Sequence, residues 1–238
     1  MVVAAIPLTE VASALGVGDR SHIALVGGGG KTTLLHALGD QLAGRIVLTT
    51  TTKMGADEHR GRTLLLDPTD DRIVETSSAG PVVALRRTEG DKAIGVDPSR
   101  CDGWFAAVDH VVIEADGSRG RPFKAPAAYE PVIPSTVTVV VHVIGVDALG
   151  RVIADQCHRP LRVAALAGCD ARQRLEPHMA ARVITHERGV RRSIPAGAEL
   201  AVAITKVDEA TMHHADRLTA ELCRHAPDIR IVTIARHA

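Results

Sequence analysis

The chain has 238 residues, of which 45% are hydrophobic, so it is long enough for one large α/β domain or two small ones. Lysine plus arginine and aspartate plus glutamate each number 28, and only 2% of the residues are aromatic, which argues against nucleic acid as the main partner. Four cysteines without a C-x-x-C pair, and the lack of any apolar run near ~18 residues, predict a reduced cytoplasmic protein without a membrane span.

The first predicted element is an amphipathic helix at residues 8–16. Its apolar side chains recur at helical spacing, and Gly16 ends it. We expect this N-terminal segment, residues 1–19, to cover an edge of the sheet rather than to carry chemistry.

The first motif with chemical content is a glycine loop between a strand pattern at 22–26 and a helix pattern that runs to Leu42. It consists of Gly27, Gly28, Gly29, Gly30, Lys31, Thr32 and Thr33. Glycines let backbone N–H groups point into one concavity, lysine adds charge for the outer phosphates, and the threonine hydroxyl suits Mg²⁺. The loop lacks the first glycine of G-x-x-x-x-G-K-[ST], which would fall at Leu25, and it resembles the shorter loops of SIMIBI-class NTPases. A flexible glycine linker is the alternative.

A second buried strand at 45–48 runs into four threonines and a lysine. Ligands bind at the carboxyl ends of strands in open parallel sheets, so Thr51, Thr52 and Lys53 are candidates for ligand contact. The alternative is a run of β-branched residues that only finishes the strand. Residues 55–105 show strand patterns at 63–66 and 82–85 and a helix start at 67–71, without a chemical motif.

A third strand pattern, at 109–113, ends in two acids, Glu114 and Asp116. They are two residues apart, so both project from one face of an extended strand. In the second half of a phosphate-loop NTPase such an acid holds Mg²⁺, and we expect one of the pair to orient the ion and the other a nucleophilic water. The sequence leaves open which acid does which, and a solvated acid pair is the alternative.

A basic, proline-rich segment follows at 118–134. Its cations Arg119, Arg121 and Lys124 are candidates for contact with phosphates or with an anionic second substrate. The alternative is a solvated basic loop.

Seven motifs together resemble the selenium-dependent hydroxylase accessory protein family, also called YqeC. They are Gly-Gly-Gly-Gly-Lys-Thr-Thr (27–33), Thr-Thr-Thr-Thr-Lys (49–53), Glu-Ala-Asp-Gly-Ser-Arg-Gly (114–120), Lys-Ala-Pro (124–126), Glu-Pro-Val-Ile-Pro (130–134), Cys-His-Arg-Pro (157–160) and Ile-Thr-Lys-Val-Asp (204–208). The resemblance implies a P-loop NTPase-like fold. It also implies a role in the maturation of a molybdenum hydroxylase, with that enzyme or its cofactor-maturation proteins as partners.

A β-branched run at 137–144 predicts a central strand, and Cys157 and His158 then place two soft ligands side by side. Metallochaperone GTPases use such pairs at dimer interfaces, which leaves a homodimer and a metal role open. One cysteine and one histidine do not make a tetrahedral site, so an ordinary polar loop is the alternative. A helix at 176–185 precedes a basic cluster, which we interpret as a solvated face.

The last motif, Thr205-Lys206-Val207-Asp208, ends a buried strand pattern. It resembles the base-reading [NT]-K-x-D motif of GTPases, in which the aspartate accepts two hydrogen bonds that guanine donates and adenine cannot, while the lysine stem packs along the base. The alternative is a polar strand end in which Asp208 caps the next helix, predicted at 209–225. A final strand is predicted at 229–234.

These patterns predict a single α/β domain over residues 1–238, a P-loop NTPase-like three-layer sandwich with a mainly parallel central sheet, SIMIBI-like. They predict Mg²⁺-dependent binding and hydrolysis of a nucleoside triphosphate, with GTP preferred to ATP. Catalysis is assigned to Lys31, Glu114 and Asp116; Mg²⁺ to Thr32, Glu114 and Asp116; and the nucleotide to Gly27, Gly28, Gly29, Gly30, Lys31, Thr32, Thr33, Thr205, Lys206 and Asp208. The alternatives are a kinase or nucleotidyltransferase with a small anionic acceptor, and a non-hydrolysing, ATP-binding carrier.

Overall fold

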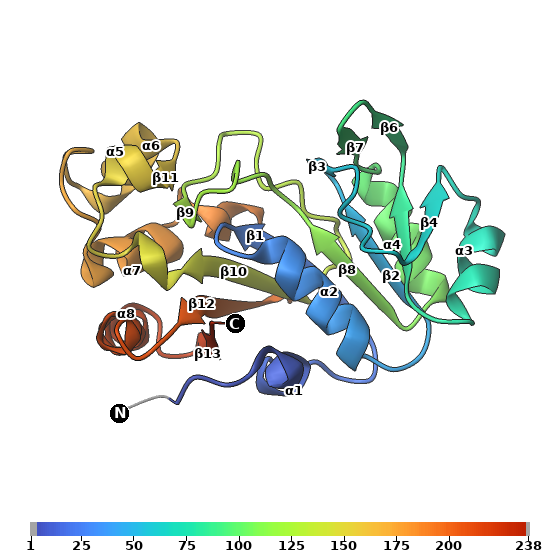
Figure 1. Cartoon of the computed structure of the whole chain (residues 1–238), viewed down its shortest axis with the longest axis horizontal. Helices are drawn as coiled ribbons and strands as arrows, with labels where there is room; N and C mark the ends of the chain where they lie inside the picture. The colour runs from blue at the N-terminus through green and yellow to red at the C-terminus, as the bar shows by residue number, and fades with distance from the viewer. Residues whose placement is uncertain (1–3, 237–238) are drawn as a thin grey trace.

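The computed structural model describes residues 4–236, and its centre is one eight-stranded sheet. The strands are β1 (Ser21–Gly27), β2 (Ile46–Thr50), β4 (Thr63–Leu66), β5 (Val82–Leu85), β8 (His110–Glu114), β10 (Val139–Gly145), β12 (Glu199–Val207) and β13 (Arg230–Ala235). Their order across the sheet is β13–β12–β10–β1–β8–β2–β5–β4, and every neighbouring pair is parallel (Figure 1). Continuous runs of valine, isoleucine, leucine and alanine suit strands that are buried on both faces.

Helices cover both faces of this sheet. On one face lie α1 (Val11–Ala14), which follows a 3-10 turn at Leu8–Glu10, and α2 (Lys31–Gln41); on the other lie α3 (Asp70–Ser77), α4 (Pro98–Ala107), α7 (Pro177–Thr185) and α8 (Met212–His225). Alternate residues of each strand serve the two cores. In β1, Leu25 packs with the α2 side and Val26 with the α4 side. The predicted three-layer α/β fold with a parallel central sheet is confirmed.

The predicted N-terminal helix is present and lies against α2 and β13. The predicted helix at 209–225 begins later, at Met212, because Asp208 and Thr211 form a hydrogen-bonded turn before it. The sequence analysis missed α4, the short helix α5 (Ile153–Gln156) and α6 (Pro160–Ala167).

Two small sheets stand at the carboxyl edge of the large one, and neither was predicted. An antiparallel sheet contains β3 (Lys53–Gly55), β6 (Arg87–Glu89) and β7 (Lys92–Ile94), and a parallel pair joins β9 (Phe123–Lys124) to β11 (Cys157–His158). They lie above the two halves of the large sheet in Figure 1. Strands of two or three residues are too short to show a period in the sequence.

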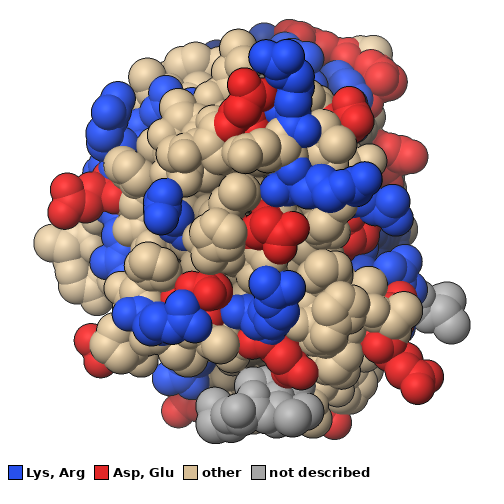
Figure 2. Space-filling view, turned by 90° about the vertical axis from the view of Figure 1, so that its left-hand side faces the viewer, with Lys and Arg blue, Asp and Glu red and all other residues tan. Residues whose placement is uncertain are grey.

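The face that carries α5 to α8 is turned to the viewer in Figure 2, where basic and acidic side chains are interspersed. This mixture agrees with the equal numbers of basic and acidic residues in the chain. Within residues 4–236, none of the helices combines the length and the apolar character that crossing a membrane requires.

Candidate functional site

The carboxyl end of β1 turns directly into the glycine loop, and α2 begins at Lys31. Gly27, Gly29 and Gly30 have φ angles of 92°, 89° and 120°, which L-residues with a side chain rarely adopt. A Cβ atom at Gly28 would lie 2.4 Å from the backbone oxygen of Arg121. The backbone therefore needs glycine at all four positions, which excludes the alternative of a flexible linker.

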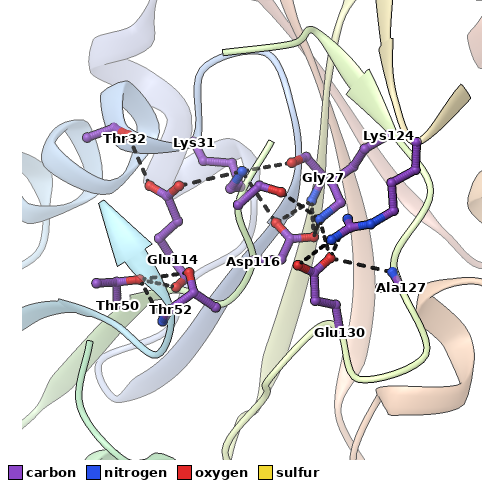
Figure 3. Close-up of polar contacts among 12 residues, drawn as sticks. Gly27, Lys31, Thr32, Thr50, Thr52, Glu114, Asp116, Lys124, Ala127 and Glu130 are labelled. Carbon is purple, nitrogen blue, oxygen red and sulfur yellow. Dashed lines mark hydrogen bonds and ion pairs between the residues drawn. The ribbon is translucent and has the colours of Figure 1, made fainter. Parts of the chain in front are cut away.

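The ammonium group of Lys31 is buried at the centre of the site, with 3% of the residue exposed. Its Nζ donates to the Gly27 carbonyl at 2.7 Å and lies 3.3 Å from Asp116 Oδ1 and 3.5 Å from Glu114 Oε1 (Figure 3). Burial by itself lowers the pKa of Lys31, but the two carboxylates outweigh burial, so the pKa is raised. Lys31 therefore carries a fixed positive charge at the glycine loop.

Thr32 and Glu114 face one another beside this lysine. The Thr32 hydroxyl donates to Glu114 Oε2 at 2.9 Å, and Glu114 is 7% exposed at the end of β8. Two neighbouring ligands of an octahedral Mg²⁺, each at about 2.0–2.1 Å, lie about 2.9 Å apart, so these two oxygens fit adjacent positions around one ion. Burial raises the pKa of Glu114 above its usual range, an effect that a bound cation would oppose.

Asp116 lies on the other side of Lys31. Both of its oxygens accept from the Gly27 backbone N–H, each at 3.1 Å, and Oδ2 lies 3.0 Å from Lys124 Nζ. Of the two acids, Glu114 is the one that Thr32 contacts. The structure therefore brings Lys31, Glu114 and Asp116 together, but Asp116 is bonded to the backbone of the glycine loop.

Lys124 continues a chain of buried ion pairs away from the loop. It is fully buried, and its Nζ contacts Asp116, Glu130 at 2.7 Å and the Gly117 carbonyl at 2.7 Å (Figure 3). Glu130 in turn accepts two hydrogen bonds from Arg159, at 2.7 and 3.0 Å. The prediction that Lys124 meets phosphates in an open loop is wrong, because the side chain is enclosed and both ends of its environment are acidic.

Sequence reasoning missed Glu130 and Arg159 as parts of the site. Both fall in motifs that carried the family resemblance, but nothing local shows that they meet across 29 residues. Of the other predicted loop cations, Arg119 lines the cleft at the glycine loop, whereas the Arg121 side chain donates to the Asp155 carbonyl.

The Thr205–Asp208 motif is divided among three tasks. Thr205 Oγ1 donates to the carbonyl of Gly29 and so ties the glycine loop to β12. Lys206 lines the cleft and pairs with Asp147 at 2.8 Å. Asp208 accepts from Thr211 and pairs with Arg236 at 2.8 Å, so the helix-capping alternative is realised at Asp208.

A cleft of about 760 Å³ opens in front of the loop. Its charged lining residues are Lys31, Lys53, Arg60, Lys92, Arg119, Arg159 and Lys206 on the basic side and Glu58, Glu114 and Glu130 on the acidic side. Seven cations against three acids make the cleft a binding site for a polyanion. Thr52 also lines it, whereas the Thr51 hydroxyl donates to the Val132 carbonyl at 2.7 Å.

The Cys157–His158 pair does not make a metal site in this structure. Cys157 is buried in β11, and burial raises the pKa of its thiol to about 12, so the thiolate form is absent at neutral pH. His158 lines the cleft, and burial lowers the pKa of its imidazole to about 4. Across residues 4–236 there is no group of three or more histidine, cysteine, aspartate or glutamate side chains placed to hold a metal ion.

Comparison with known proteins gives one family and one structural similarity. The family model described as "YqeC protein" matches residues 23–161, more than half of the chain. "Uncharacterized protein YqeC" from Escherichia coli (strain K12) is 32% identical over 186 residues, covering 74% of this chain and 72% of the relative. The crystal structure of hydrogenase maturation factor HypB from Archaeoglobus fulgidus aligns with 96% of this chain and 88% of that chain, at 14% identity. The TM-score is 0.39, too low to transfer any property.

Proposed function

The chain belongs to the YqeC family, and from this premise we propose that it binds a nucleoside triphosphate with Mg²⁺ and hydrolyses it. The observation that carries the proposal is the contact of Thr32 with Glu114, at 2.9 Å, directly beside Lys31 and the glycine loop. A hydroxyl, an acid, a buried lysine and free loop amides are the groups that a phosphate-loop NTPase uses.

Each residue then has a defined task. The N–H groups of the glycine loop and the first turn of α2 bind the phosphates, and Lys31 stabilises negative charge on the β- and γ-phosphates. Mg²⁺ held by Thr32 and Glu114 would neutralise further charge on the same oxygens. We propose that Asp116 positions the loop through the Gly27 N–H rather than holding the ion. Catalysis would consist of positioning and electrostatic stabilisation.

We predict that Glu114→Gln weakens Mg²⁺-dependent nucleotide binding by about tenfold or more, because one anionic ligand of the ion is lost. The measurement is a Mg²⁺ titration with a fluorescent GTP analogue, comparing the Mg²⁺ midpoint of the variant with that of the wild type. Thr32→Ser is the matched control, because it keeps a hydroxyl at the same place and should keep the midpoint within about twofold. An unchanged midpoint in Glu114→Gln would remove Glu114 from the metal site.

We propose guanine as the preferred base, because the Thr205–Asp208 motif stands at the end of β12 and Lys206 lines the cleft. Asp208 is paired with Arg236, so base reading requires guanine to take the place of this half-exposed pair. Pairs of this kind contribute little to stability, so the exchange is inexpensive in free energy.

The expected result for Asp208→Asn is a shift of preference from GTP towards XTP by roughly tenfold, because the amide donates to the xanthine oxygen where the carboxylate accepted from the guanine amine. Competition titrations of GTP, XTP and ATP against one fluorescent nucleotide measure it. Arg236→Gln is the control, and it should hold or strengthen GTP binding because it frees the carboxylate. Wild-type protein that binds ATP more tightly than GTP would contradict the guanine assignment.

Two alternative functions keep the same nucleotide site. A kinase or nucleotidyltransferase would turn over only when an acceptor is added, and a carrier would bind nucleotide without turnover. Release of inorganic phosphate from nucleotide and Mg²⁺ alone separates hydrolysis from both.

We propose, from the family resemblance, that turnover serves the maturation of a molybdenum-dependent hydroxylase in the cytoplasm. The four cysteines are all unpaired, which supports a reducing compartment. Hydroxylase activity in a strain that lacks this protein tests the role, and wild-type protein but not a nucleotide-binding variant should restore it.

A further inference from the structure

The small antiparallel sheet β3–β7–β6 presents two lysines to the cleft. In its register Lys53 lies opposite Ile94 and Gly55 lies opposite Lys92, so Lys53 and Lys92 project from the same face. Met54 and Ala93, on the other face, belong to the buried core next to α2. The sheet is therefore anchored by its apolar face, and its basic face lines the cleft.

This sheet is held tightly at the carboxyl end of β2. The Gly95 N–H donates to the Thr52 carbonyl at 2.6 Å, and the Val96 N–H donates to the Thr50 carbonyl at 2.9 Å. A Cβ atom at Gly95 would lie 2.3 Å from the Thr50 oxygen and 2.6 Å from the Thr52 nitrogen, so only glycine permits this approach. The backbone that carries Lys53 and Lys92 is thus fixed beside the glycine loop rather than hanging from a free hairpin.

Arg60 adds a third cation to the same wall. The segment that carries it lies on α2, where the Glu58 carbonyl contacts His36 Nε2 at 2.7 Å, and Arg60 Nη2 lies 3.4 Å from Thr33 Oγ1. Together Lys53, Arg60 and Lys92 are called the basic wall below.

The basic wall has little compensating negative charge. Among residues 4–236, Lys53 has no carboxylate within 4.0 Å, Lys92 has only its neighbour Asp91 at 3.5 Å, and Arg60 has only Glu58 at 3.8 Å. Glu89, which lies opposite Lys92 across the strands, pairs with Arg87 at 2.6 Å. On the opposite side of the cleft, by contrast, Glu130 and Asp147 bind Arg159 and Lys206 closely.

We propose that the basic wall is a subsite for the phosphate group of a second, small phosphorylated substrate that binds beside the nucleotide. The inference rests on the proposed function for the placement of the nucleotide. The base-reading motif ends β12, and β2 lies on the opposite side of β1 in the strand order, beyond β8. A nucleotide with its base near Lys206 therefore directs its last phosphate towards β2, and the second anion would sit next to that phosphate. This position differs from the Arg119–Lys124 loop that the sequence suggested for an acceptor.

The test uses the full chain and inorganic phosphate as the probe. The protein is saturated with Mg²⁺ and a non-hydrolysable GTP analogue, which fills the glycine loop, and phosphate is then titrated at low ionic strength by calorimetry. We expect saturable binding, a loss of phosphate affinity of about tenfold or more in Lys53→Gln/Lys92→Gln, and a change in nucleotide affinity below about threefold. The control is Arg86→Gln, which removes an exposed cation next to β6 that lies outside the cleft; it should leave phosphate affinity within about twofold.

Three results would overturn the inference: no saturable phosphate binding to the nucleotide-loaded wild type, equal phosphate affinity in the wild type and the double variant, or a parallel loss of nucleotide affinity, which would mean that the lysines hold the nucleotide itself. If the wild type binds no nucleotide, the proposed function fails. Phosphate titration of the unliganded wild type and double variant then decides the subsite by itself, because equal affinities would contradict it and a loss in the variant would support it.

Discussion

Replacing Lys31 by methionine is expected to abolish measurable binding of nucleoside triphosphate. The ammonium group is fixed at the glycine loop by the Gly27 carbonyl and stands between Glu114 and Asp116. A charge-assisted contact of this kind contributes up to about 3 kcal/mol, which corresponds to a loss of roughly 100-fold in affinity. Titration with fluorescent GTP and ATP, with and without Mg²⁺, measures the effect.

The same substitution removes the positive charge between two buried carboxylates. Loss of one partner from a buried ion pair costs about 3–5 kcal/mol, so Lys31→Met should also be less stable in urea denaturation. The double variant Lys31→Met/Glu114→Gln separates folding from binding, because it removes one of the uncompensated acids. It should recover part of the stability and none of the affinity. A folded Lys31→Met protein that binds triphosphate as the wild type does would refute the central proposal.

The second large effect is expected from Asp116→Asn. The amide oxygen can still accept from the Gly27 N–H, but Lys31 and Lys124 lose the charge that lies between them. Both ammonium groups are almost fully buried, so we expect the free energy of unfolding to fall by about 3–5 kcal/mol. Urea denaturation measures the loss, and Asp147→Asn is the matched control. Asp147 also pairs with a lysine, but that pair is about one third exposed, and the loss there should stay below about 1 kcal/mol.

The Mg²⁺ dependence of Asp116→Asn decides between its two assignments. If Asp116 positions the loop, the Mg²⁺ midpoint for nucleotide binding stays within about twofold of the wild type, while Glu114→Gln shifts it. A shift in Asp116→Asn as large as that in Glu114→Gln would restore the sequence-based assignment of both acids to the ion. The comparison is made at a temperature where both variants are folded.

The local chemistry of the glycine loop could be predicted from sequence because it depends on neighbouring residues. A buried strand, four glycines, a lysine, a hydroxyl residue and a helix are contiguous, and the structure has them in that arrangement. Glu114 was also predictable, since the carboxyl end of a parallel strand lies at the ligand-binding edge. The sheet order puts β8 directly beside β1, which brings Glu114 to Thr32.

The two acids illustrate where sequence reasoning stops. Their spacing correctly indicates one face, since both reach Lys31. It does not indicate that Asp116 is captured by the Gly27 N–H and Lys124, because β8 ends at Glu114 and the chain changes direction after it. In the same way, the Thr205–Asp208 motif has the spacing of a base-reading loop, but Arg236, at the end of β13, occupies the Asp208 carboxylate.

The sequence by itself determined the parallel α/β fold, the glycine loop and the Thr32–Glu114 pair, because hydrophobic periodicity and contiguous motifs encode them locally. Only the tertiary structure decided the path of the ion pairs from Lys31 through Asp116, Lys124 and Glu130 to Arg159. It also decided that Lys53 and Lys92 share one wall of the cleft. The physical reason is that these contacts join loops and short strands far apart in the chain, and their burial makes a charge depend on its partner rather than on its neighbours in sequence.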